Sequence, residues 1–181
     1  MPMETKRLRL RPFLFSDSAR VALLAGDRKI AFNTATLPHP YEERMAVEWI
    51  ARHETYRAEG SQYIYAIEKK EENELVGTIS LVVNETHRQA ELGYWVGVPY
   101  WGLGYATEAG EAILDFGFRE LPIQKVFARH FATNPASGRV MQKLGMKLEG
   151  RLREHLIRFE IAHDMVYYSI LRDEYEKGRS P

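Results

Sequence analysis

Two glycines and an alanine stand close together in residues 99–109, which read PYWGLGYATEA. The segment follows an apolar run that ends at Val98, and it precedes a pattern typical of a helix. Gly102, Gly104 and Ala106 leave the main-chain N–H groups of this junction uncovered, and the start of a helix adds partial positive charge there. The sequence therefore predicts that this turn can hold a diphosphate group.

Glycines alone do not decide the function of such a turn, because a structural role is the more frequent explanation of an isolated Gly-x-Gly pair. The segment lacks the Gly-Lys-Ser/Thr ending with which nucleoside-triphosphate loops reach the phosphates and magnesium. It also lacks the third small residue of the dinucleotide-binding fingerprint, since Thr107 stands there. A plain nucleotide-binding module is therefore disfavoured.

The composition is that of an ordinary globular protein: 181 residues, 45% hydrophobic and 28% charged, with 25 basic and 25 acidic side chains. A net charge of zero gives no reason to expect nucleic acid or a membrane as partner. The absence of cysteine excludes thiolate chemistry, and the six histidines show no metal-ligand spacing, so we expect no metal. With no signal-peptide layout and no apolar run near the roughly 20 residues that span a bilayer, we expect a cytoplasmic protein.

Hydrophobic periodicity predicts the elements that must position this turn. We expect strands at residues 8–13, 63–68, 75–83, 90–98, 125–132, 147–157 and 164–171, and helices at 17–24, 41–59, 104–120 and 134–145. Asn134 suits the N-cap of the last helix, Pro135 its first position and Gly145 its exit. The order indicates an α/β (α+β) three-layer fold, with a mixed sheet of about seven strands flanked by helices in a single domain, residues 1–181.

The run WGLGYATEA resembles the cofactor-binding signature of the GNAT superfamily of N-acetyltransferases, in which Gln/Arg-x-x-Gly-x-Gly/Ala holds the diphosphate of coenzyme A. Gly104 and Ala106 match its small positions, and Trp101 stands where the family has Gln or Arg, as is common in the RimJ/RimL-like branch. Further motifs similar to that branch follow in order: TKRLRLRP at 5–12, ELGYW at 91–95, NPAS at 134–137, KLGM at 143–146 and HD at 163–164. Their order along the chain makes the resemblance more specific than any single motif.

The resemblance implies a sheet that splays at its central strand, and acetyl-coenzyme A as co-substrate. In the family, free backbone groups of that strand pair with the pantetheine arm, and an N–H such as that of Val96 can stabilise an oxyanion. Gly97 would favour the close approach of another backbone. The residues implied to bind the coenzyme are Tyr94, Trp95, Val96, Gly97, Val98, Trp101, Gly102, Leu103, Gly104, Tyr105, Ala106, Thr107, Asn134 and Ser137.

The resemblance also implies a carboxylate base on the central strand, and Glu91 is the candidate, acting directly or through water. Strand alternation places Glu91 on the face opposite Leu92 and Tyr94. A surface or salt-bridged glutamate is the equally weighted alternative.

The proton donor for the departing thiolate is less directly indicated. Many GNAT enzymes have a tyrosine seven residues after the helix-opening asparagine, but this chain has Met141 there, which cannot donate a proton. The resemblance leaves Ser137 as the candidate donor to the sulfur, with a helix-first-turn serine as the alternative. Asn134 likewise either contacts the coenzyme or only caps the helix.

Together, the motifs predict an acetyl-coenzyme A-dependent N-acetyltransferase that acts on a primary amine by direct attack through a tetrahedral intermediate. The acceptor is expected to be a protein N-terminal α-amine or a small-molecule amine, bound by the loop 33–41, the helix after it and the last strands. Members of the branch are often dimers, so a homodimer is an expectation. A catalytically weak coenzyme A-binding sensor or scaffold is the alternative that the methionine at position 141 favours.

Overall fold

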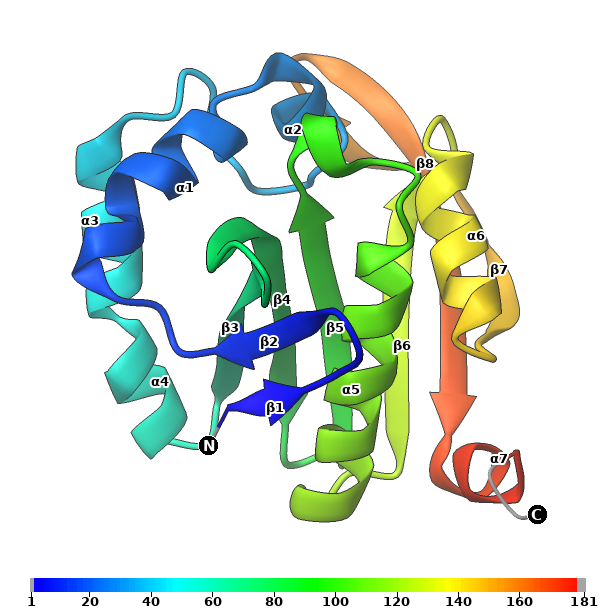
Figure 1. The fold of residues 1–181 in the computed structure, drawn as a ribbon. Helices are drawn as coiled ribbons and strands as arrows, with labels where there is room; N and C mark the ends of the chain where they lie inside the picture. The colour runs from blue at the N-terminus through cyan, green and yellow to red at the C-terminus, as the bar shows by residue number, and fades with distance from the viewer. Residues whose placement is uncertain (1, 179–181) are drawn as a thin grey trace.

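The computed structural model describes residues 2–178 and contains an eight-stranded mixed sheet (Figure 1). The strands are β1 (Met3–Glu4), β2 (Leu8–Arg11), β3 (Gln62–Lys69), β4 (Glu74–Asn84), β5 (Gln89–Val96), β6 (Lys125–Phe131), β7 (Lys147–Arg158) and β8 (Ile161–Leu171). Their order across the sheet is β1-β2-β3-β4-β5-β6-β8-β7, and β5 pairs with β6 in parallel. The predicted α/β arrangement is confirmed, with one strand more than expected.

Helices cover both faces of this sheet. They are α1 (Ser18–Ala25), α2 (Arg28–Phe32), α3 (Glu43–Ala51), α4 (His53–Ala58), α5 (Tyr105–Glu120), α6 (Pro135–Lys143) and α7 (Arg172–Lys177), with 3-10 turns at Phe15–Asp17 and Val98–Tyr100. Helices α5 and α6 pack on one face, whereas α1 and α3 pack on the other. The turn between β7 and β8 reaches across the top of the molecule to α2 (Figure 1).

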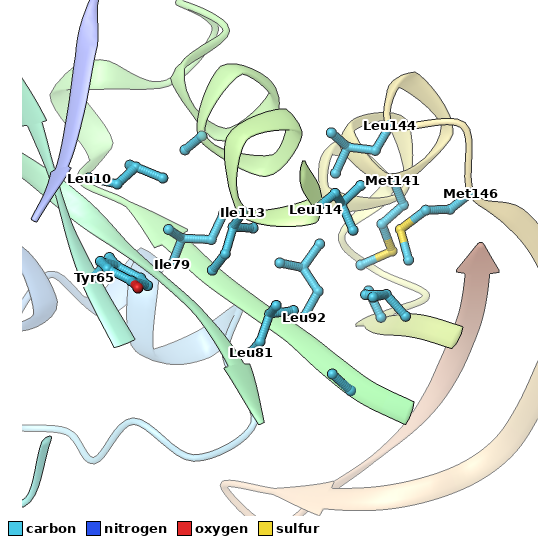
Figure 2. Close-up of a cluster of buried hydrophobic side chains, with 14 of the residues drawn as sticks. Leu10, Tyr65, Ile79, Leu81, Leu92, Ile113, Leu114, Met141, Leu144 and Met146 are labelled. Carbon is cyan, nitrogen blue, oxygen red and sulfur yellow. The ribbon is translucent and has the colours of Figure 1, made fainter. Parts of the chain in front are cut away.

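The alternation of side chains along β3 divides the core in two. Tyr65 and Ile67 belong to the larger cluster, whereas Ile64 and Ala66 belong to the smaller one below α1 and α3. Figure 2 shows the larger cluster filling the space between α5, α6 and the sheet. Each fully buried leucine or isoleucine of this kind contributes about 1.5–3 kcal/mol relative to an exposed one, so this packing holds α5 and α6 firmly on the sheet.

The sheet splays between β5 and β6. The two strands pair only near their starts, from Gln89↔Lys125 to Glu91↔Phe127. Beyond those pairs β5 continues to Val96 and β6 to Phe131 without pairing to each other. The C-terminal halves of the two central strands therefore leave an opening in the sheet, as the resemblance implied.

The structure differs from the expected elements at one predicted helix and at three short elements that were not predicted. The helix predicted at 41–59 is two helices, because the Arg52 N–H bonds to the Trp49 carbonyl three residues back and the chain turns there. Strand β1 has two residues, and α2 and α7 have five and six residues, so each is too short to show a hydrophobic period.

Candidate active site

The turn before α5 has a left-handed backbone at both of its glycines. Gly102 and Gly104 adopt φ of 77° and 82°, the left-handed region that favours glycine, and Gly104 is the N-cap of α5. The Glu108 N–H makes a hydrogen bond of 3.0 Å to the Gly104 carbonyl. The N–H groups of Tyr105, Ala106 and Thr107 precede this first turn of the ladder and have no acceptor within the helix. They form a donor set at a helix N-terminus, which suits an anion.

Arg7, in the turn between β1 and β2, holds this loop from outside. Its guanidinium donates to the Leu103 carbonyl at 2.9 Å and to the Glu108 carboxylate at 2.7 Å, and it lies over the Tyr105 ring. Thr5 also donates to Glu108, at 2.6 Å. Partial burial opposes ionisation, but the hydrogen bonds from Thr5 and Arg7 outweigh it and lower the pKa of Glu108. The negative charge of Glu108, in the first turn of α5, is thus neutralised by the Arg7 guanidinium.

A cavity of about 340 Å³ opens beside this loop, between β5 and the start of α6. The predicted coenzyme-binding residues that line it are Tyr94, Trp95, Val96, Trp101, Gly102, Gly104, Tyr105, Ala106, Thr107, Asn134 and Ser137. Two cations that the sequence reasoning missed, Arg139 and Lys143, also line it. Their spacing of four residues on α6 places them on one helix face, which was the available signal.

Gly97, Val98 and Leu103 do not line this cavity. The close approach at Gly97 is to α1, because an added Cβ would lie 2.8 Å from the Leu24 side chain. The Gly97 N–H bonds to the Val76 carbonyl at 2.8 Å, and the Leu103 carbonyl is bound to Arg7. These contacts are structural, and a role for the three residues in coenzyme binding stays a prediction.

A second, larger cavity of about 560 Å³ lies on the other side of the opening, bounded by the loop 33–38, α3, β4 and β6. Five residues line both cavities: Asn33, Thr34, Tyr94, Trp95 and Ser137. The two spaces therefore share walls where β5 and β6 diverge. This arrangement allows two substrates to meet from opposite sides of the sheet.

The backbone of β5 turns polar groups toward the opening. Because the Gly97 N–H bonds to β4, the alternate residues Tyr94 and Val96 direct their N–H and C=O groups to the β6 side. β6 does not pair with β5 at this level. The Val96 carbonyl accepts a hydrogen bond of 2.6 Å from the Trp101 indole, which ties the loop to the strand end.

The Tyr94 hydroxyl reaches Ser137 at the junction of the two cavities. It lies 2.8 Å from the Ser137 Oγ and 3.0 Å from the Ser137 carbonyl oxygen. Burial raises the pKa of Tyr94 to about 12, against a smaller opposite effect of the Ser137 hydrogen bond. Asn134 caps α6 by accepting from the Ser137 N–H, and it also lines the 340 Å³ cavity beside α5, so both of its predicted roles fit its position.

Glu91 faces the second cavity, on the side of β5 opposite Leu92, as alternation predicted. Its carboxylate forms an ion pair of 2.8 Å with Arg129 on β6, a partner that the sequence did not reveal. Arg129 also donates to the Tyr167 hydroxyl at 3.4 Å. Burial opposes the charge on Arg129, but Glu91 outweighs it and raises the pKa of the guanidinium. The salt-bridged alternative is therefore present in the geometry, and a role as base stays a prediction.

The donor set fits coenzyme A. Free N–H groups stand at a helix N-terminus, nothing lies within 4 Å of a Cβ placed on Gly102, and two cations stand nearby on α6. Among residues 2–178, no group of histidine or acidic side chains is arranged to hold a metal ion. Across the same residues, no helix has the length and apolar character needed to cross a membrane.

Comparison with known proteins identifies the class. Residues 7–147 match the acetyltransferase (GNAT) domain family, and the chain belongs to it. The uncharacterized N-acetyltransferase YnaD of Bacillus subtilis is 30% identical over 97% of this chain and 99% of its own length. A GNAT-family acetyltransferase from Bacillus anthracis has a similar structure, with a TM-score of 0.85 and 26% identity over 96% of this chain and 99% of that one.

The [ribosomal protein uS5]-alanine N-acetyltransferase of Escherichia coli is 25% identical over 68% of this chain and 65% of its own length. The chain spans 66% of the length of two further curated relatives. The protein is thus an acetyltransferase of the GNAT family, similar in part to a ribosomal-protein enzyme, as the motifs predicted.

Proposed function

We propose that the protein transfers the acetyl group of acetyl-coenzyme A to a primary amine of a protein N-terminus or a small molecule. The coenzyme would enter the cavity beside α5, and the acceptor would enter the cavity beside α3. The observation that carries this proposal is that the two cavities share Tyr94, Trp95 and Ser137 at the opening between β5 and β6. An amine on one side and a thioester on the other would meet there.

Each residue at the opening has a role in this proposal. The N–H groups of Tyr105, Ala106 and Thr107 would hold the diphosphate, helped by the cations on α6. The Val96 N–H, which faces the opening, would stabilise the oxyanion that forms as the amine attacks the thioester carbonyl. Glu91 would accept the proton of the attacking amine, directly or through water, and Ser137 would donate a hydrogen bond to the sulfur.

The charges around the acceptor cavity favour an amine with a single positive charge. Two carboxylates, Glu48 and Glu91, and two guanidiniums, Arg52 and Arg129, line the cavity, so its charged walls balance. A polyamine carries several positive charges and would find no surplus of carboxylate here. Aromatic walls, including Trp49, instead suit an apolar body next to the amine. A homodimer and a cytoplasmic location stay predictions.

Thiol release tests the proposal directly. The chain has no cysteine, so free coenzyme A is the only thiol that forms when the purified protein turns over acetyl-coenzyme A. We would compare an alanine-initiated peptide, phenethylamine and spermidine as acceptors, and identify the products by mass spectrometry. We expect release with a single-amine acceptor and less with spermidine. Coenzyme binding without release on a broad panel would leave the sensor or scaffold alternative, which the Glu91–Arg129 ion pair and the methionine at position 141 favour.

A further inference from the structure

The position on α6 where many GNAT enzymes have a donor tyrosine is Met141 in this chain, and a methionine side chain has no proton to donate. Met141 is 1% exposed and packs in the larger core cluster, close to Met146 (Figure 2). A donor to the departing sulfur must therefore come from another part of the opening, where both substrates can be reached.

Three side-chain hydroxyls line both cavities: Thr34, Tyr94 and Ser137. The Thr34 hydroxyl bonds to carbonyl oxygens of α2, those of Ile30 at 3.0 Å and Ala31 at 3.3 Å, so it is directed away from the opening. Tyr94 and Ser137 lie within hydrogen-bond distance of each other. They are therefore the two hydroxyls that can act on a substrate at the opening between β5 and β6, where the two cavities share walls.

Either oxygen can donate in the 2.8 Å contact between the Tyr94 hydroxyl and the Ser137 Oγ, whereas the 3.0 Å contact with the Ser137 carbonyl can use only the Tyr94 proton. A phenol carries one proton, so the two hydroxyls can be ordered in two ways. When Tyr94 donates to Oγ, the proton of Ser137 is free to point to a third group. Burial raises the pKa of Tyr94 to about 12, which keeps its proton in place during turnover.

We propose that Tyr94 is a positioning residue that donates to the Ser137 Oγ and so directs the Ser137 hydroxyl at the coenzyme sulfur. This inference rests on the proposed function. As the carbon–sulfur bond breaks, the electron pair stays on sulfur, and the hydrogen bond from Ser137 stabilises that negative charge. No proton leaves Tyr94 in this step. The hydrogen bonds from Tyr94 to Ser137 and from Ser137 to sulfur thus supply the stabilisation of the thiolate that Met141 cannot supply.

The pKa of the bound coenzyme A thiol tests these two hydrogen bonds without any amine substrate. We would measure thiolate absorbance against pH for protein saturated with coenzyme A, and subtract the same titration with desulfo-coenzyme A, so that the tyrosines cancel. Since hydrogen bonds to a thiolate lower its pKa, we expect Tyr94→Phe and Ser137→Ala each to raise the thiol pKa by about one unit, a tenfold change in thiolate stability. The double variant should show no further increase, because both changes remove the same chain of bonds.

Tyr168→Phe is the matched control. The Tyr168 hydroxyl also links a strand to α6, by accepting from Gln142 at 3.1 Å, but Tyr168 lines neither cavity. If Tyr94 only anchored α6, Tyr168→Phe would shift the thiol pKa too, and that result would overturn the inference. An unchanged thiol pKa in Tyr94→Phe, with coenzyme binding intact by calorimetry, would overturn it as well and leave the proposed function standing. A wild-type protein that does not bind coenzyme A would overturn both.

Discussion

Gly104 combines two requirements at one residue. Its positive φ makes the turn into α5, and its position before the free N–H groups sets their direction. A side chain at such a backbone conformation costs about 1–2 kcal/mol. The glycine signal in the sequence was therefore a signal about backbone conformation, and the role we propose for Gly104 in coenzyme binding follows from it.

Gly104→Ala is expected to weaken coenzyme A binding by about tenfold or more, because relaxing the strained turn moves the donors of α5. Calorimetric titration with coenzyme A measures this. Gly145→Ala is the matched control, since Gly145 has a φ of 78° at the exit of α6 and does not line the cavity beside α5. Both variants should lose similar stability, but only the first should lose affinity. Equal affinities would show that the Gly104 turn does not hold the coenzyme.

Glu91→Gln is expected to lower kcat/KM by about 10²- to 10⁴-fold for an alkylamine acceptor, the usual contribution of a general base. The loss should be smaller for a peptide α-amine, because about a tenth of that amine is already neutral at pH 7. Steady-state thiol release on both acceptors measures the difference.

The control for Glu91 is Glu48→Gln, since Glu48 is an exposed carboxylate of the same cavity. It should leave kcat on both acceptors close to wild type, because removing this carboxylate changes the charge of the cavity wall and hence acceptor binding, whereas Glu91→Gln should lower kcat itself. Full activity of Glu91→Gln would instead assign this glutamate to the ion pair with Arg129 alone.

At the scale of elements, the β1–β2 turn and the start of α5 act as one unit. Arg7 joins them through the Leu103 carbonyl and the Glu108 carboxylate. Arg7 is one of three arginines that alternate along residues 7–11, and it is the one that fixes the loop. The remaining arginines pair with acidic side chains, Arg9 with Glu4 and Glu68 and Arg11 with Asp17 and Glu68.

Arg7→Met is expected to weaken coenzyme A binding by about threefold to tenfold, because Glu108 would lose its guanidinium partner near the site of the phosphates. The loss should shrink at high salt, since salt screens the repulsion between the carboxylate and the phosphates. Calorimetry at two salt concentrations measures it. Arg9→Met, in the adjacent strand β2 and away from the loop, should leave the affinity unchanged. Equal losses in the two variants would contradict a specific role of Arg7.

At the scale of the whole molecule, a histidine packed against the smaller core cluster makes the free energy of unfolding depend on pH. His53 lies against the rings of Phe13 and Trp49, at 5.4 and 4.3 Å between centroids. Neither of its ring nitrogens has a hydrogen-bond partner within residues 2–178. Burial, and to a lesser extent the charge of Arg57, lowers the pKa of His53 to about 4.

This shift predicts lower stability in acid. Between about pH 6.5 and pH 4 the unfolded chain binds a proton at His53 and the folded chain does not, so the free energy of unfolding falls as the pH falls through that range. After a discount for partial exposure we expect a loss of about 1 kcal/mol at pH 5 from this residue. Urea unfolding at pH 7.5 and pH 5 measures it. His53→Phe should reduce the difference, whereas His87→Gln, in an exposed turn, should not. An unchanged pH dependence in His53→Phe would exclude this histidine as its source.

Much of the site could be predicted from the sequence because its signals are local. Gly102 and Gly104 encode a backbone conformation, and Asn134 encodes a helix cap. The alternation around Glu91 encodes which face of the strand it occupies. Such signals depend on neighbours within a few residues, so they are already present in the chain before it folds.

The partners of these residues came only from the tertiary structure. The pairings of Glu91 with Arg129, Tyr94 with Ser137 and Arg7 with Glu108 join positions 38 to 101 residues apart. Residues so distant meet only through the strand order and the divergence of β5 from β6, which no local pattern contains. The sequence by itself determined the family, the fold class and the backbone of the glycine turn before α5. The tertiary structure decided which charges are compensated and which hydroxyls meet at the opening, because those contacts depend on how whole elements pack.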